Sequence, residues 1–132
     1  MVRPRHTNPT PGELEVLQVI WERGPSTVRE VMGILNQNRP RAYTTIMSLM
    51  NVMEEKGLLA SKPQGRAYVY SAKTTRKKAQ KELLGDLLTR AFDGSTNELV
   101  SHLLDQAKPT QEELDQISDV IAQYKKTGRD KS

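Results

Sequence analysis

The sequence predicts a mainly α-helical protein with one small β-hairpin, and three observations support this fold class. Apolar residues recur with helical spacing over most of the 132 residues. One alternating stretch, residues 58–71, is interrupted by the turn sequence Pro63-Gln64-Gly65-Arg66. The composition, 36% hydrophobic and 27% charged, is that of an ordinary globular protein, and no apolar run is long enough to span a bilayer.

Two short helices are expected first. Thr10-Pro11-Gly12-Glu13 has the pattern of a capping box that begins a helix, and Gly24-Pro25 ends it. A second helix is expected to begin at Ser26 or Thr27, because Glu30 follows Thr27 at capping-box spacing. Its apolar stripe is Val28, Val31, Met32 and Leu35.

The third helix is expected over residues 42–56. Ile46, Leu49, Met50 and Met53 repeat at helical spacing and should face the core, so the opposite face centres on Thr44, Ser48 and Asn51. Soluble helices usually carry long charged side chains on the exposed face. A face of short, uncharged polar groups is therefore unusual, and such groups are able to contact base edges in DNA.

Two strands, residues 58–62 and 67–71, follow this helix and are joined by the basic turn. The order of helices and hairpin predicts a winged helix-turn-helix domain over residues 10–72. Base edges would be read by the short polar face, and phosphate or groove contacts would come from cations and amides beside it. The residues predicted on this basis are Arg41, Thr44, Ser48, Asn51, Gln64 and Arg66.

Several alternatives remain open. The same polar face would also suit a winged-helix adaptor that binds protein. Residues 1–9 form a basic arm with Arg3, Arg5 and His6, which could enter a minor groove but is expected to be a disordered tail. The cationic run that opens the fourth helix either contacts phosphate or is solvated; it contains Arg76, Lys77, Lys78 and Lys81.

Residues 73–126 are expected to form a helical dimerisation domain, followed by a polar tail over residues 127–132. Its apolar stripes exceed what three helices bury alone, and a second copy of the chain would cover them. The predicted interface residues are Leu83, Leu84, Leu87, Leu88, Phe92, Leu99, Leu103, Leu114, Ile117, Ile121 and Tyr124. A two-fold dimer would match a two-fold DNA site.

The composition limits which partners, cofactors and metal sites the chain can have. The net charge is +4, with 9 Lys and Arg against 6 Asp and Glu through Ala72, which is compatible with a polyanionic partner. Cysteine is absent, which excludes disulfides and thiolate metal sites. His102 precedes Asp105 by three residues, but a surface or interface histidine is favoured over a metal ligand. No cofactor, metal or enzyme activity is predicted, and we expect a cytoplasmic protein.

The residues also resemble the penicillinase-repressor (BlaI/MecI-type) family. The resemblance rests on Glu15-Val16-Leu17 with Ile20-Trp21, then on AYTTIMSLM, EEKGLL and GRAYVYSA, and runs from about Pro9 to Lys126. It implies a winged-helix domain, a helical dimerisation domain and a repressor of palindromic operators with TACA and TGTA half-sites, often guarding β-lactamase or related genes. By position it places Thr44, Thr45 and Ser48 at the major groove and Gly65-Arg66 at the wing tip. The predicted DNA-binding set therefore also includes Thr45 and Gly65. It further includes Met47, at the margin of the polar face, and Tyr43 at the start of the helix.

Three departures from the family pattern stand out. Val52 occupies a position where the family usually has arginine, so a backbone contact or ion pair is missing. Family members are inactivated by a sensor protease at an Asn-Phe bond after a Leu-Val pair, whereas His102-Leu103 follows Leu99-Val100-Ser101 here. The absence of cysteine excludes the copper-responsive branch. Cleavage near His102 and Leu103 by a sensor protease therefore cannot be assumed.

Overall fold

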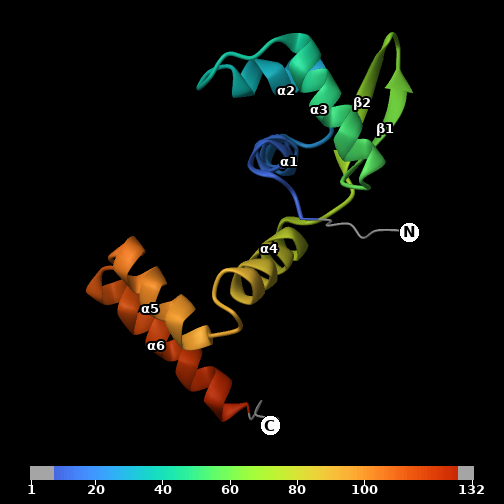
Figure 1. The fold of residues 1–132 in the computed structure, drawn as a ribbon. Coiled ribbons are helices and arrows are strands. Elements are labelled where there is room, and N and C mark those ends of the chain that lie inside the picture. Colours follow the sequence, from blue (N-terminus) through green and yellow to red (C-terminus); the bar gives the residue numbers. More distant parts are fainter. Residues whose placement is uncertain (1–7, 128–132) are drawn as a thin grey trace. The chain divides into compact units, whose positions relative to one another are not determined.

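A computed structural model describes residues 8–127, and there the chain forms six helices and one two-stranded sheet (Figure 1). The chain divides near Asp86 into two compact units. The arm residues Arg3, Arg5 and His6 and the end of the predicted tail lie outside the described residues. The elements are α1 Pro11–Arg23, α2 Val28–Leu35, α3 Tyr43–Glu55, β1 Leu59–Gln64, β2 Ala67–Ala72, α4 Arg76–Arg90, α5 Thr96–Ala107 and α6 Gln111–Lys126.

Helices α1 and α2 begin as their sequences predict. The Glu13 backbone N–H donates a hydrogen bond to the Thr10 hydroxyl, and the Thr10 backbone N–H donates one to the Glu13 carboxylate. This reciprocal pair completes a capping box. Thr27 and Glu30 make the same reciprocal pair at the start of α2. Two amides that would otherwise lack partners are thereby satisfied at each helix start.

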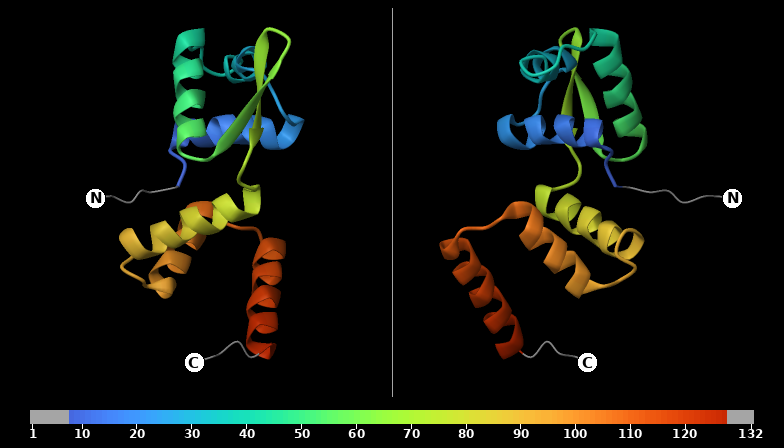
Figure 2. Two further views of the ribbon diagram at one scale, coloured as in Figure 1. Left: turned by 90° about the vertical axis from the view of Figure 1, so that its right-hand side faces the viewer. Right: turned by 60° about the vertical axis from the view of Figure 1, so that its left-hand side comes forward.

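Helix α3 ends in a left-handed turn that leads directly into the hairpin. Gly57 has φ +86°, which an L side chain rarely adopts. The Leu58 amide donates to the Met53 carbonyl and the Gly57 amide to the Glu54 carbonyl, the pair of bonds that defines a Schellman motif. This motif turns the chain back so that β1 runs beside α3 (Figure 2).

The hairpin is longer than the predicted strands. Its register pairs Leu59 with Ala72 at one end and Gln64 with Ala67 at the other, which leaves a two-residue loop of Gly65 and Arg66. Gly65 has φ +64°, and a positive φ at the first loop position suits a tight hairpin turn. Pro63 and Gln64, expected in the turn, are therefore the last residues of β1.

An isolated β-bridge connects the hairpin to the segment between α1 and α2, and the sequence did not predict it. Ser26, between α1 and α2, exchanges two backbone hydrogen bonds with Tyr70, at 3.0 and 2.8 Å. Ser26 itself is fully buried. The bridge ties the helical part of the domain to β2.

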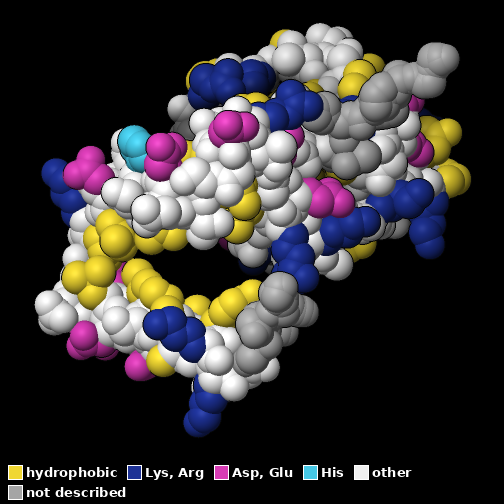
Figure 3. Space-filling model, turned by 60° about the horizontal axis from the view of Figure 1, so that its bottom comes forward, with side chains coloured by type: hydrophobic (Ala, Val, Ile, Leu, Met, Phe, Trp, Pro, Cys, Tyr) yellow, Lys and Arg dark blue, Asp and Glu magenta, His cyan; other side chains and the backbone are white. Residues whose placement is uncertain are grey.

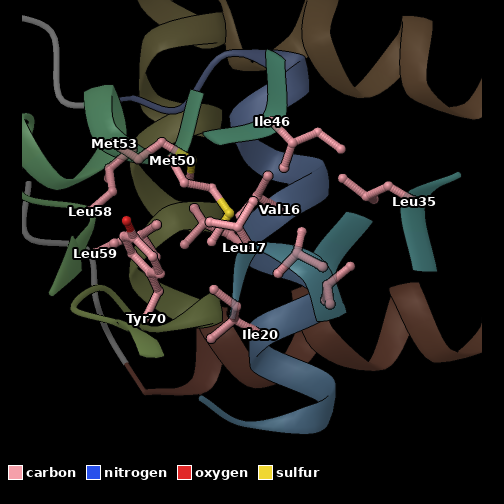
Figure 4. Packing of buried hydrophobic residues seen from close by; sticks show 13 residues of the cluster. Val16, Leu17, Ile20, Leu35, Ile46, Met50, Met53, Leu58, Leu59 and Tyr70 are labelled. Atoms are coloured by element: carbon pink, nitrogen blue, oxygen red, sulfur yellow. The ribbon is translucent and has the colours of Figure 1, made fainter. Parts of the chain in front are cut away.

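One apolar core holds α1, α2, α3 and the hairpin together (Figure 4). Ile46, Met50 and Met53 of α3 are fully buried, which confirms the inward face that their spacing predicts. They pack in a cluster with side chains of α1, α2 and both strands. The other members are Val16, Leu17, Val19, Ile20, Val28, Val31, Leu35, Leu58, Leu59 and Tyr70.

A polar pair fixes the far end of α3 against α1. The Lys56 ammonium lies 2.7 and 3.0 Å from the two carboxylate oxygens of Glu13, whose side chain is only 4% exposed. The same carboxylate caps α1. A buried carboxylate needs such partners because its desolvation is costly.

The start of α4 is attached to α1. The Trp21 indole N–H donates to the Thr74 carbonyl at 2.9 Å, and the Arg76 guanidinium lies 5.4 Å from the centre of the Trp21 ring. The first compact unit accordingly extends through Asp86, whereas the sequence-based boundary was placed at residue 72. Arg76, the first residue of the cationic run, thus contacts Trp21 of the same chain.

The second unit contains the end of α4, α5 and α6. Ser95 caps α5, and Thr110 with Glu113 forms a capping box at α6. Within residues 8–127, no helix combines the length and apolar character that crossing a bilayer requires.

Candidate nucleic-acid interface

The outward face of α3 carries the short polar side chains that the sequence places there. Thr44, Thr45, Ser48 and Asn51 are all exposed, while Met47 is half-buried at the edge of this face. We call Thr44, Thr45, Ser48 and Asn51 the reading face. Because none of these side chains is long or charged, the edges of base pairs could approach the backbone of α3 closely.

The N-terminus of α3 is open. Its N-cap is Ala42, which offers no side-chain acceptor. In the described residues the other five helices each begin with a Ser or Thr hydroxyl that accepts a backbone amide. The first amides of α3, those of Tyr43 and Thr44, are therefore left for an external acceptor, for which phosphate is suited.

Arg29 lies beside this helix start, and the sequence analysis missed it. Its guanidinium is 5.2 Å from the centre of the Tyr43 ring, so the first turns of α2 and α3 are joined by a cation–π contact. Among the described residues Arg29 forms no ion pair. A cation in the first turn of a helix opposes the helix dipole, and that signal was available in the sequence.

A cleft of about 490 Å³ separates α3 from the hairpin. Tyr43, Met47 and Asn51 line it from α3, and Arg66, Tyr68 and Tyr70 line it from the hairpin side. Figure 2 shows the hairpin running alongside α3, with the wing tip near the N-terminal end of the helix. The helix and the wing therefore form the two walls of one cleft.

Two hydrogen bonds cross between α3 and the hairpin. The Tyr70 hydroxyl donates to Asn51 Oδ1 at 3.1 Å, and the Ser61 hydroxyl donates to the Glu54 carboxylate at 2.8 Å. Burial raises the pKa of Tyr70 above its ordinary value, and the nearby Glu54 carboxylate raises it further. Tyr70 therefore stays protonated and remains a donor at neutral pH.

The predicted wing residues lie at the hairpin tip. Gln64, Gly65 and Arg66 are all exposed, and so is Lys62 on β1. The alternation of the strands puts Lys62 and Gln64 on the face of the hairpin that points away from Tyr70. Two cations thus flank the tip.

Arg41 is engaged within the domain. Its side chain is 12% exposed, lies 2.7 Å from the Glu15 carboxylate, and also donates to the Leu35 carbonyl at 3.3 Å. The Asn36 side chain makes two hydrogen bonds with the Arg41 backbone, at 2.9 and 3.1 Å. Arg41, which was predicted to bind DNA, thus holds the turn between α2 and α3 in place.

The predicted interface residues of the second unit are largely uncovered in the single chain. Leu87, Leu103 and Ile121 are each about half exposed, and Val120, which the sequence analysis did not include, is 67% exposed. Three of the other predicted residues are also exposed: Leu84, Ile117 and Tyr124. The rest are half-buried: Leu83, Leu88, Phe92, Leu99 and Leu114. Figure 3 shows hydrophobic side chains gathered on this part of the surface.

His102 and Leu103, the predicted cleavage region, lie in the interior of α5. Both side chains are exposed, and the His102 ring lies 5.5 Å from the Phe92 ring. The backbone at this bond is helical.

A family model described as Penicillinase repressor matches residues 9–123. This chain belongs to the penicillinase repressor family. Two relatives have lengths similar to that of this chain. The penicillinase repressor of Bacillus licheniformis is 25% identical over 113 residues, which cover 86% of this chain and 88% of that protein. The transcriptional regulator BlaI of Mycobacterium tuberculosis is 32% identical over 99 residues, 72% of each chain.

The solved structure of transcriptional regulator Tm0710 from Thermotoga maritima is also similar to this chain. It shares 23% identity, with a TM-score of 0.47, and the match covers 90% of this chain and 75% of that one. The family assignment confirms the resemblance seen in the sequence. As a member of the penicillinase repressor family, the protein is a BlaI-type transcriptional regulator, and the family consists of repressors rather than enzymes.

Proposed function

We propose that this protein is a dimeric, sequence-specific repressor that binds palindromic operators in the cytoplasm. Helix α3 enters the major groove and the reading face contacts base edges, while the hairpin contacts the neighbouring backbone. The observation that carries the proposal is the reading face itself: Thr44, Ser48 and Asn51 are exposed, short and uncharged, with Arg66 at the wing tip beside them. Hydroxyls and amides of this kind are among the groups that read base edges in the major groove.

Phosphate contacts would position the reading face. Arg29, held over Tyr43, and the open amides of Tyr43 and Thr44 suit one phosphate position, and Arg66 with Gln64 suits another. Arg41, engaged with Glu15, would act indirectly by fixing the entry into α3. Contacts of this kind carry no sequence information but set the register.

The second unit would pair two copies of the chain. The stripe Ile117, Val120, Ile121 and Tyr124 follows helical spacing along α6, and these side chains are exposed in one chain. A two-fold dimer carries two copies of α3 and matches an operator with two related half-sites. Because the two half-sites are linked, binding of the dimer is far tighter than binding of one domain.

We infer the class of regulated genes from the names of two relatives. Two related proteins are named for penicillinase repression and as BlaI, so β-lactamase or related genes are the proposed targets. We likewise propose that a sensor protease controls the repressor. Cutting at His102-Leu103 would require α5 to unwind locally, because residues 96–107 are helical.

The test is a comparison of two duplexes. One carries TACA and TGTA half-sites as a palindrome, and the other has the same composition in scrambled order. Fluorescence anisotropy should give a Kd on the order of 10³-fold lower for the palindrome at physiological salt. Equal Kd values for the palindrome, the scrambled duplex and duplexes selected from random DNA would refute the proposal and leave the protein-binding adaptor as the explanation of the reading face.

A further inference from the structure

The three residues that join β2 to α4 are each held by a hydrogen bond. The Lys73 backbone N–H donates to the Leu58 carbonyl at 2.8 Å, and the Thr74 carbonyl accepts the Trp21 indole N–H at 2.9 Å. The Thr75 hydroxyl accepts a backbone amide from the first turn of α4 at 3.0 Å, which caps the helix. The position of the start of α4 is therefore fixed against both α1 and the hairpin.

One face of the first turn of α4 packs against the rest of the first unit. The Arg76 guanidinium lies 5.4 Å from the centre of the Trp21 ring. Ala79, three residues further on and so on the same face, is 2% exposed, whereas Gln80 beside it is exposed. A methyl group on an isolated helix would be open to solvent, so other parts of this unit cover it. We call Trp21, Thr74, Arg76 and Ala79 the α4 latch; all four lie in the first unit.

Helix α4 connects the reading face to the second unit along the chain. It runs from Arg76 to Arg90 and so continues past Asp86, where the first unit ends. A helix of this length measures about 22 Å, so a tilt of about 10° at its first turn moves its far end by about 4 Å. One base-pair step along DNA is about 3.4 Å. A small change at the latch is therefore comparable to a whole step of the operator.

We propose that the α4 latch sets the half-site spacing that the repressor accepts. The inference rests on the proposed function, because it assumes a dimer paired through the second unit with one α3 on each half-site. With the latch closed, the two copies of α3 are held at one separation and one spacing is bound tightly. With the latch open, that separation varies, so neighbouring spacings are accepted and the best spacing loses affinity as the effective concentration falls.

The test measures binding to operators whose spacing changes one base pair at a time. The starting duplex is the palindrome that full-length wild type selects from random DNA, and its centre is lengthened or shortened by one and two base pairs. Ala79→Gln adds volume at the buried position while keeping an uncharged residue that favours helix, and Gln80→Ala at the exposed neighbouring position is its control. Arg76→Ala removes the cation beside Trp21, and Lys77→Ala, which removes an exposed cation from the same run, is its control.

The state of the latch is measured separately from DNA binding. Trp21 is the only tryptophan of the chain, so its fluorescence reports on the latch directly. In Ala79→Gln its emission should shift to longer wavelength and its quenching by acrylamide should increase, because the ring loses its cover. Gln80→Ala should match wild type in both. Circular dichroism and thermal melting establish that each variant is folded.

Wild type and the two controls, Gln80→Ala and Lys77→Ala, should favour one spacing. Their Kd should rise on the order of tenfold or more when one base pair is added or removed. In Ala79→Gln that penalty should fall to about threefold or less, and in Arg76→Ala to an intermediate value. The Kd of Ala79→Gln for a duplex with a single half-site should equal that of wild type, because the reading face and the wing are unchanged.

Three outcomes would overturn the inference. One is a wild-type protein that binds every spacing of its palindrome equally well. The second is a folded Ala79→Gln variant that shows the Trp21 emission shift and keeps the wild-type spacing preference. The third is a matching loss of single half-site affinity in Ala79→Gln, which would assign the latch to the fold of the winged-helix domain.

Failure of the proposed function looks different, because wild type would then select no palindrome at all. Should Ala79→Gln not fold, or leave the Trp21 emission unchanged, Arg76→Ala decides the matter. Arg76 is exposed, so its replacement leaves the packed core intact. An unchanged spacing preference in Arg76→Ala would then overturn the inference, and a reduced penalty with Lys77→Ala unchanged would support it.

Discussion

At the residue scale, the reading face depends on hydroxyls that project little beyond the α3 backbone. Thr44→Ala and Ser48→Ala each remove one hydroxyl from an exposed position, so stability should change little. Each should reduce discrimination between operator and scrambled duplex by about 1 kcal/mol per half-site, or about 2 kcal/mol and roughly 30-fold in the Kd ratio for the dimer. Anisotropy titrations with both duplexes measure this ratio. If both variants kept the full wild-type ratio, bases would be read from elsewhere.

Arg29 makes a different kind of contribution. If it meets a phosphate, Arg29→Ala should weaken operator and scrambled duplexes by the same factor, and the slope of log K against log salt should become shallower by about 0.9 for each half-site, or about 1.8 for the dimer. Lys125→Ala removes an exposed cation from α6 and serves as the control. A loss confined to one sequence, or an unchanged salt slope, would contradict the phosphate role.

At the element scale, one polar contact holds the C-terminal end of α3 to α1. Lys56→Met would leave the Glu13 carboxylate buried with fewer partners, and should lower the free energy of unfolding by on the order of 2 kcal/mol. Urea denaturation followed by fluorescence of Trp21, the only tryptophan, measures the change. Lys78→Met is the control, because its pair with Glu82 is 3.9 Å long and exposed, and removing it should cost less than about 0.5 kcal/mol. Equal losses in the two variants would contradict the structural role of the buried pair.

The helices could be predicted because their signals are local. The apolar stripe of α3 and the capping boxes at Thr10, Thr27 and Thr110 lie within a few residues in sequence, and the structure has them all. The predicted turn began two residues too early because Pro63 is a frequent turn residue, whereas in this hairpin it lies within β1.

The contacts that could not be predicted join distant parts of the chain. The Ser26–Tyr70 bridge and the Trp21–Thr74 hydrogen bond link residues more than 40 positions apart, and no spacing rule connects them. The roles of Arg29 and Arg41 depend on which helix faces which, and this is set by the packed core. Sequence alone placed Arg41 with the external contacts, whereas the structure shows it paired with Glu15.

At the scale of the whole molecule, operator binding should depend on pairing of the second unit. Ile117→Glu with Ile121→Glu would put two charges into the exposed apolar stripe of α6. The variant should sediment as a monomer at micromolar concentration and bind the palindrome at least tenfold more weakly, while a single half-site is bound as before. Wild-type protein that is monomeric at the same concentration would remove the basis for the dimer.

The most direct test of the central claim exploits the absence of cysteine from the chain. Ser48→Cys provides a single thiol on the reading face, to which an iron chelate that cuts DNA is attached. Gln18→Cys on α1 is the control, since Gln18 lines the groove toward α2 and not the cleft beside the hairpin. We expect localised cuts within each half-site of the operator from the chelate at position 48, and none from position 18. Uniform or absent cutting by a bound Ser48→Cys protein would show that α3 does not lie against the bases.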